Sequence, residues 1–140
     1  MCTALAIFDK NILFGRNMDI DQGFNEQVIL LPKDYKIHFK FEKKIKSKYS
    51  ILGMGTIIDG YPLFADAMNE EGVAFAALAF KDNCKYYEYD KCKKNYAPYE
   101  FCLYILANCK SIEEIRWFLN SINIVDEPFN IEVLNTPLHF

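Results

Sequence analysis

The sequence predicts an α+β fold, because strand-like and helix-like patterns occupy different parts of the chain. Over the first two-thirds, short apolar runs alternate with polar residues or are separated by turn-forming residues, as β-strands require. The last third carries a helix-capping sequence followed by apolar residues at helical spacing. With 140 residues, of which 51% are hydrophobic and 16% aromatic, the chain is long enough to form one domain with its own core.

The first predicted element is a β-hairpin. Two apolar runs, Ala4–Phe8 and Ile12–Phe14, are separated by three polar residues that favour a turn. A hairpin returns its second strand to the beginning of its first. We therefore expect Arg16 and Asp19, which follow the second run, to lie near Cys2.

The sequence up to residue 80 predicts further strands. The segment 36–42 alternates apolar and polar residues, which is the period of a half-buried strand. Asn69–Gly72 is a typical four-residue hairpin loop, with Gly72 placed for a positive φ. Because Val73–Phe80 is almost wholly apolar, we expect it in the middle of a sheet that is covered on both faces. The other expected strands are Val28–Leu31, Tyr49–Thr56 and Pro62–Met68.

The segment 33–48 is rich in lysine. It could be a patch that attracts an anionic substrate, a membrane or nucleic acid. The alternative, which we favour, is the solvated face of a long hairpin on which lysines discourage edge pairing. His38 lies on the polar side of this segment, and we expect it to be exposed.

The last third predicts two helices that pair as a helical hairpin across a sheet. Ala97–Cys109 is apolar and should be mostly buried. Ser111 and Glu114 form a capping box, with Ser111 as N-cap and Glu114 at the third helical position. The aromatic residues of this region, including Trp117, are expected in the core. The second helix carries its apolar residues at Ile112, Ile115, Phe118, Leu119 and Ile122.

Composition excludes several functional classes. The net charge of −3 and the pI of about 5.4 do not favour nucleic acid as a partner. No apolar run approaches the ~18 residues that a membrane span needs, and the N-terminus lacks the layout of a signal peptide, so we expect a cytoplasmic protein. The odd number of cysteines argues against a disulfide framework, and their spacing against a zinc site. The five cysteines are Cys2, Cys84, Cys92, Cys102 and Cys109. A redox or thiol-binding role ranks last, because Cys102 and Cys109 lie in the apolar helix and should be buried.

Cys2 follows Met1 directly and is the leading candidate for chemistry. Once Met1 is removed, Cys2 carries an α-amine with an ordinary pKa of about 8 beside a thiol with one of about 8.5, and the amine can act as the base for the thiol. A nearby Arg16 would lower the pKa of the thiol or hold an anion, and Asp19 would orient the amine. A surface Arg–Asp pair at a strand end remains an equally weighted alternative.

Several motifs share one register with a known family. Met1–Ala4, Phe14–Ile20, Leu52–Thr56, Phe64–Gly72 and Asn135–Phe140 together resemble the choloylglycine hydrolases, N-terminal nucleophile hydrolases that include bile salt hydrolases and penicillin V acylases. The similarity runs from Met1 to Phe140. It implies a four-layer αββα sandwich of which residues 1–140 form the N-terminal portion of a single domain. Family members are longer and have a catalytic Asn and Arg further along. We therefore expect an N-terminal fragment that is inactive, or nearly so, alone.

The resemblance also implies roles for individual residues. Cys2 would cleave a linear amide through a thioester, with Arg16 and Asp19 in the positions of the family's Arg and Asp. The backbone amide of Ala79 would contribute to the oxyanion hole. Bile salt hydrolases usually carry Asn at this position and penicillin acylases often Tyr, so the alanine departs from the pattern. The family requires no cofactor or metal.

The same resemblance places four apolar residues in the substrate pocket: Met18, Phe24, Ile58 and Phe64. For Ile58 and Phe64, packing in the core is an equally weighted alternative. The register favours glycine- or taurine-conjugated bile acids as the small-molecule amide substrate over penicillin V or an acyl-homoserine lactone. A non-catalytic pseudoenzyme fragment remains the alternative from another class. By resemblance, the full-length protein would be a homo-oligomer, a tetramer in the family.

Overall fold

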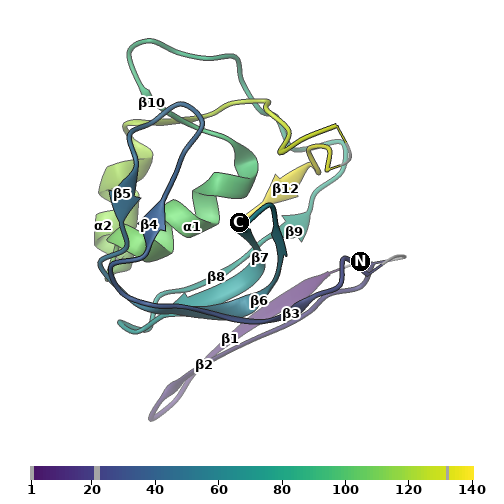
Figure 1. Ribbon diagram of the computed structural model, residues 1–140. Coiled ribbons are helices and arrows are strands. Elements are labelled where there is room, and N and C mark those ends of the chain that lie inside the picture. The colour runs from purple at the N-terminus through teal and green to yellow at the C-terminus, as the bar shows by residue number, and fades with distance from the viewer. Residues whose placement is uncertain (1, 21–22, 132) are drawn as a thin grey trace.

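The computed structural model describes residues 2–20, 23–131 and 133–140. Two helices lie on one side of a sheet, and the N-terminal hairpin projects on the other side (Figure 1). This arrangement confirms the α+β class. The strands are β1 (Thr3–Phe8), β2 (Ile12–Asn17), β3 (Gln27–Leu31), β4 (Lys36–Ile37), β5 (Ile45–Lys46), β6 (Ile51–Ile58), β7 (Tyr61–Asn69), β8 (Ala74–Ala76), β9 (Leu78–Ala79), β10 (Lys94–Tyr96), β11 (Ile122–Ile124) and β12 (Leu138–His139); the helices are α1 (Pro98–Asn108) and α2 (Ile112–Leu119).

The predicted N-terminal hairpin is confirmed. β1 and β2 pair antiparallel in a register that sets Thr3 opposite Asn17 and Ala4 opposite Arg16. The Thr3 amide also donates to the Asn17 side-chain oxygen at 2.7 Å. Cys2 therefore lies at the end of the ladder beside the residues that follow β2.

The central sheet has the strand order β3-β6-β7-β8, with every pair antiparallel. The expectation that Val73–Phe80 forms a central strand is wrong. The run divides into β8 and β9, and β8 lies at the end of this sheet, whereas β9 pairs with β12. Its apolar residues are covered from one side by α1, where Phe75 packs edge-on against Phe101 with ring centroids 5.7 Å apart.

β6 and β7 contain an irregularity that matters for the site. The register shifts between Met54 and Gly55, which pair with Asp66 and Phe64, so Ala65 is the extra residue of a β-bulge. In a regular strand, Phe64 and Asp66 would share one face. Because of the bulge, Phe64 packs on the core below α1, while Asp66 faces the hairpin β1–β2.

The loop between β7 and β8 is tied to the helix layer by Asn69, which is only 3% exposed. Its side-chain oxygen accepts from the amides of Glu71 and Val73, and its amide group donates to the carbonyls of Leu106 and Cys109 at 3.0 and 2.8 Å. Gly72 has a φ of 85°, as predicted for this loop. One side chain thus closes the hairpin and satisfies carbonyls at the C-terminal end of α1.

α1 confirms the predicted buried helix, and its first turn explains a wrong expectation. Glu100 accepts from the Ala97 amide at 2.9 Å, which closes a capping box, and from the Lys40 amide at 2.7 Å. The segment 36–42 therefore pairs as a strand only at Lys36–Ile37, because the Lys40 amide bonds the buried carboxylate instead of a neighbouring strand. The alternating burial is nevertheless present, and His38 is exposed as expected.

α2 begins at the predicted cap, since the Glu114 amide donates to the Ser111 hydroxyl. The return bond differs from the prediction, because Glu114 accepts from the Lys110 amide and not from Ser111. Trp117 was expected in the core, and this is wrong: its exposed fraction is 77%. The helix has only eight residues, and it packs through Phe118 and Ile115 while Trp117 faces solvent.

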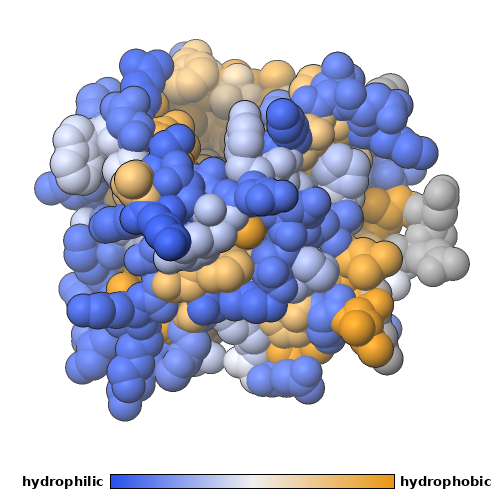
Figure 2. All heavy atoms as spheres, turned by 90° about the horizontal axis from the view of Figure 1, so that it is seen from above, coloured by the Kyte–Doolittle hydropathy of each residue, from blue (hydrophilic) through white to orange (hydrophobic). Residues whose placement is uncertain are grey.

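The two sides of the molecule differ in polarity. Viewed from above, the surface is mainly hydrophilic (Figure 2). The sheet face that is turned away from the helices exposes apolar side chains of β3, β6 and β7: Val28, Leu30, Leu52, Met54 and Met68. Among the described residues, no helix combines the length and the apolar character that crossing a membrane would take.

Candidate active site

Arg16 connects the N-terminal hairpin to the central sheet. It lies on β2, yet its guanidinium reaches across to the central sheet, and only 6% of the side chain is exposed. One terminal nitrogen donates to the carbonyl of Ala77 at 2.6 Å, and Nε lies 3.4 Å from a carboxylate oxygen of Asp66. The other terminal nitrogen is buried without a hydrogen-bond partner. Arg16 therefore docks the hairpin on the sheet and retains a free donor.

Asp66 is a site residue that sequence reasoning missed. Its charge in the otherwise apolar run 64–68 was the available signal, because a carboxylate on such a strand needs a partner. Burial raises the pKa of Asp66, while the Arg16 guanidinium and a backbone hydrogen bond from Met54 oppose this shift. The carboxylate is thus held in an unfavourable setting that Arg16 makes tolerable.

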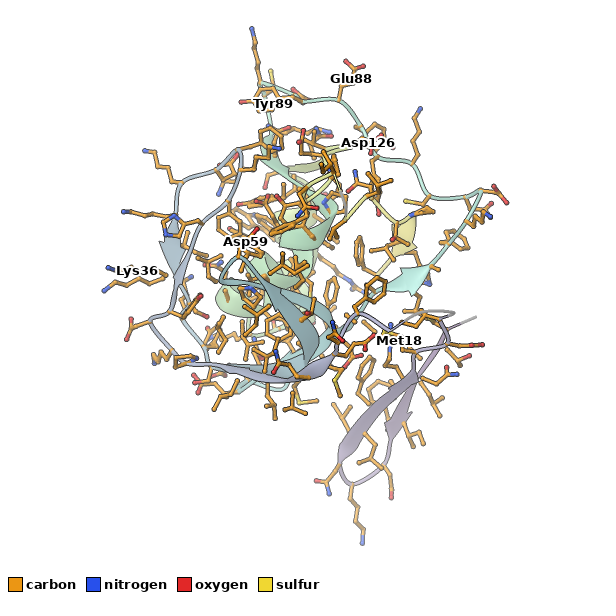
Figure 3. All side chains as sticks on the ribbon, turned by 45° about the vertical axis from the view of Figure 1, so that its right-hand side comes forward. Met18, Lys36, Asp59, Glu88, Tyr89 and Asp126 are labelled. Atoms are coloured by element: carbon orange, nitrogen blue, oxygen red, sulfur yellow. The ribbon has the colours of Figure 1, made fainter. Side chains whose placement is uncertain are left out.

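Cys2, Arg16 and Met18 share one face of the hairpin. Cross-strand neighbours lie on the same side of a sheet, and continuing the register sets Cys2 opposite Met18, next to the Ala4–Arg16 pair. Cys2 is half-buried, and Met18 lies where the hairpin meets the rest of the molecule (Figure 3). Met1, whose removal the sequence-based hypothesis requires, lies outside the described residues.

Asp19 is exposed and follows the end of β2. A hydrogen bond to the chain's amino terminus, together with the positive charge of that amine, lowers the pKa of Asp19. That amino terminus belongs to Met1, which lies outside the described residues, so the role of Asp19 beside a Cys2 amine stays a prediction.

An apolar cavity of about 200 Å³ lies between α1, the ends of β6 and β7, and the C-terminal segment. This volume is below the ~300–1,000 Å³ of common ligand sites. All four residues expected from the resemblance line it, Ile58 and Phe64 included. Sequence reasoning missed other lining residues, which come from segments distant in the sequence: Tyr99, Cys102, Phe129, Leu134 and Phe140.

A second, more open cavity contains Arg16 and Asp66, and it adjoins the apolar one. Met18 and Glu26 line both cavities. An apolar ligand group in the first cavity would therefore have its polar end directed past Met18 toward the arginine. Such a combination of an apolar cleft with few polar groups is typical of small-molecule sites.

Ala79 lies on β9, opposite Leu138 of β12. The next residue, Phe80, donates its amide to the Pro137 carbonyl of the β12 side at 2.8 Å. Because amides alternate in direction along a strand, the Ala79 amide points away from β12. The carbonyl of Ala77, two residues earlier, accepts from Arg16, so this side of the strand faces the arginine.

Metal ligands do not gather anywhere in the described part of the chain: no group of three His, Cys, Asp or Glu side chains is placed to hold an ion. The five cysteines carry free thiols, and burial raises the pKa of the Cys102 and Cys109 thiols above the ordinary value. Those two thiols are therefore poor nucleophiles.

Comparison with known proteins gives a consistent result. The family model described as linear amide C–N hydrolases, choloylglycine hydrolase family, matches residues 2–140. The chain is 46% identical to a bile salt hydrolase/transferase of Clostridium perfringens, over 100% of this chain and 44% of that protein. A crystal structure of a cysteine-to-alanine variant of conjugated bile acid hydrolase from the same species superposes with a TM-score of 0.91 at 44% identity, covering 99% of this chain and 43% of the other.

A penicillin V acylase from Agrobacterium tumefaciens shares the fold, with a TM-score of 0.74 at 21% identity, over 89% of this chain and 40% of that one. The chain spans less than half the length of these relatives. Its antiparallel sheets and helical pair are part of the layered fold of N-terminal nucleophile hydrolases.

Proposed function

The chain belongs to the choloylglycine hydrolase family of linear amide C–N hydrolases, and from this premise we propose that it carries the nucleophile and the acyl-binding cavity of an amidase that deconjugates glycine- or taurine-linked bile acids. The observation that carries the proposal is the continuity of two cavities. Met18 lines the apolar cavity, which suits an acyl body, and also the cavity that holds Arg16.

In the proposed reaction, Met1 is removed first and leaves Cys2 with a free α-amine. The Cys2 thiol attacks the amide carbonyl while the α-amine takes its proton. The tetrahedral intermediate expels the amine of the substrate, which leaves with that proton, and a thioester remains on Cys2. Water then attacks the thioester, again with the α-amine as base, and the free acid departs with regeneration of the thiol.

Arg16 and Asp19 support this chemistry through their charges. The buried guanidinium lies on the same hairpin face as Cys2, and its unpartnered nitrogen can donate to a developing anion. The Asp19 carboxylate orients the amine by accepting its hydrogen bonds.

The Ala79 amide is the proposed first donor of the oxyanion hole, because it points away from β12 on the side that faces Arg16. A backbone amide is retained whatever the side chain, so the departure to alanine does not remove it. Loss of one such donor costs about 10²–10³ in rate, and a complete hole requires a second donor.

The residues that line the cavity favour an apolar acyl group. Its lining is mainly aliphatic and aromatic, and Met18, Phe24, Ile58 and Phe64 occupy one continuous surface. The phenoxyacetyl group of penicillin V is the alternative occupant, because a penicillin V acylase shares the fold. A cytoplasmic location, predicted from the sequence pattern, and a homotetramer, predicted from the resemblance, remain predictions to be tested by cell fractionation and by light scattering.

The test is release of glycine or taurine from bile salt conjugates by the natural gene product, compared with its Cys2→Ala and Cys92→Ala variants. Cys92 is exposed and lies outside both cavities, so it is the matched control. We expect Cys2→Ala to abolish release and Cys92→Ala to retain it. Hydrolysis that persists in Cys2→Ala, or penicillin V cleaved in preference to bile salts, would contradict the proposal. Intact mass with and without a thiol-alkylating reagent reports whether Met1 is removed and Cys2 is accessible.

A further inference from the structure

Glu26 is a half-buried acidic residue that the proposed chemistry does not use. It follows Asn25, whose φ of 56° is left-handed. Hydrogen bonds from the backbone amides of Phe24 and Glu26 itself lower the pKa of this carboxyl group, so it is ionised at neutral pH. The carboxylate is therefore held in place before any ligand arrives.

One oxygen of this carboxylate has no partner. Oε1 of Glu26 is buried and makes no hydrogen bond within the protein. A buried, unpaired acceptor costs free energy that a ligand donor can recover, and hydrogen bonds to charged groups are among the stronger ones. Glu26 itself lies where the two cavities meet, since it lines both.

The position of this oxygen defines what it can recognise. An acyl body in the apolar cavity would pass Met18 on its way to Arg16, and Glu26 lies on that route. We propose that Glu26 is a specificity-determining residue that accepts a hydrogen bond from an N–H or O–H group of the ligand in the apolar cavity. This inference rests on the proposed function, and the donor is either the scissile amide N–H or a hydroxyl on the acyl body.

The experiment measures binding of three ligands to the natural gene product, in which Cys2→Ala is present throughout so that no ligand is hydrolysed. Glycocholate offers both donors. The sarcosine conjugate of cholic acid lacks the amide N–H, and the glycine conjugate of 5β-cholanic acid lacks ring hydroxyls. Dissociation constants are measured by calorimetry, below the micellar concentration, for this parent protein, which serves as wild type here, and for its Glu26→Gln and Glu71→Gln variants. Glutamine keeps an oxygen for the loop amides but replaces the other oxygen by a donor. Glu71 is exposed on the β7–β8 loop and serves as the matched control.

We expect Glu26→Gln to bind glycocholate about tenfold or more weakly, as loss of a hydrogen bond to a charged group predicts, and Glu71→Gln to bind as wild type does. A ligand that lacks the relevant donor should bind wild type and Glu26→Gln with equal affinity. The group missing from that ligand is therefore the donor to Glu26. Equal affinity of wild type and Glu26→Gln for glycocholate would overturn the inference but leave the proposed function standing.

If Glu26→Gln unfolds, the three ligands are compared on wild type alone. The inference then requires that wild type binds glycocholate more tightly than at least one of the two ligands that lack a donor. Equal affinity for all three would overturn the inference. Absence of any binding to wild type would overturn the proposed bile-acid cavity, and the inference with it.

Discussion

The ion pair between Arg16 and Asp66 makes a sharp prediction, in which one substitution has opposite effects in two backgrounds. At 3.4 Å, two unit charges attract by about 5 kcal/mol at an effective dielectric constant of ~20. The Asp66 side chain is 25% exposed, and solvent therefore screens part of this attraction. We expect a coupling free energy of about 2–4 kcal/mol between the two side chains. Asp66→Asn should destabilise wild type by a similar amount, because it leaves a buried guanidinium without a counter-charge.

In the Arg16→Met background, the same Asp66→Asn change should be neutral or stabilising. Burial raises the pKa of Asp66, which means that the charged carboxylate is itself disfavoured at this position once Arg16 is absent. The assay is equilibrium urea unfolding at pH 7 of wild type, both single variants and the double variant. Asp59→Asn is the control, since Asp59 is exposed with a φ of 51° that asparagine tolerates. An equal effect of Asp66→Asn in both backgrounds would refute the ion pair as the tie between hairpin and sheet.

Three further changes test the scaffold. Asn69→Ala should lower the free energy of unfolding by about 2–4 kcal/mol, because the side chain's four hydrogen bonds to backbone groups are lost; a loss below about 1 kcal/mol in urea unfolding would contradict this. Gly55→Ala should lower the free energy of unfolding by about 1–3 kcal/mol, because a Cβ there would meet the Leu63 carbonyl. Gly15→Ala should lower it much less, because a Cβ there meets nothing within 4 Å. Equal urea midpoints of the two variants would speak against the close approach of β6 and β7. Burial raises the pKa of Glu100 in the folded state. Protonation of Glu100 therefore stabilises the fold fully below the pKa of the unfolded state, and this stabilisation is lost as the pH rises through the pKa of the folded state. Wild type should accordingly gain stability relative to Glu100→Gln between pH 7 and pH 5, and a constant difference in urea midpoint across this range would count against the raised pKa.

Local sequence signals identified those features that depend on neighbours in the chain. The hairpin β1–β2, the positive φ of Gly72 and the buried α1 follow from turn residues and apolar spacing, and the structure confirms them. Trp117 was misplaced because an eight-residue helix buries only one narrow face, and apolar spacing does not specify which aromatic side chain turns outward.

The site shows the same division between local and distant contacts. Cys2, Arg16 and Asp19 are brought to one end of a hairpin by local pairing, and this proximity could be predicted from the turn. The partners of Arg16 could not, because Asp66 and Ala77 lie 50 and 61 positions further along the chain and meet it only through tertiary packing. The cavity residues that come from 99–140 were missed for the same reason.

The bulge at Ala65 has a consequence for redesign of the pocket. Phe64 lies on the cavity side and Asp66 on the arginine side. Only Ala65 separates them, and it has no pairing partner on β6. Adding or deleting a residue in β7 would turn either the cavity wall or the arginine anchor to the wrong face, so this strand tolerates exchanges of side chain but no change of length. The turn at Asp59–Gly60, exposed and already left-handed, joins the same two strands beyond the cavity residue Ile58. It is there that insertions could reshape the mouth of the pocket for a different acyl group while the anchor of Arg16 stays intact.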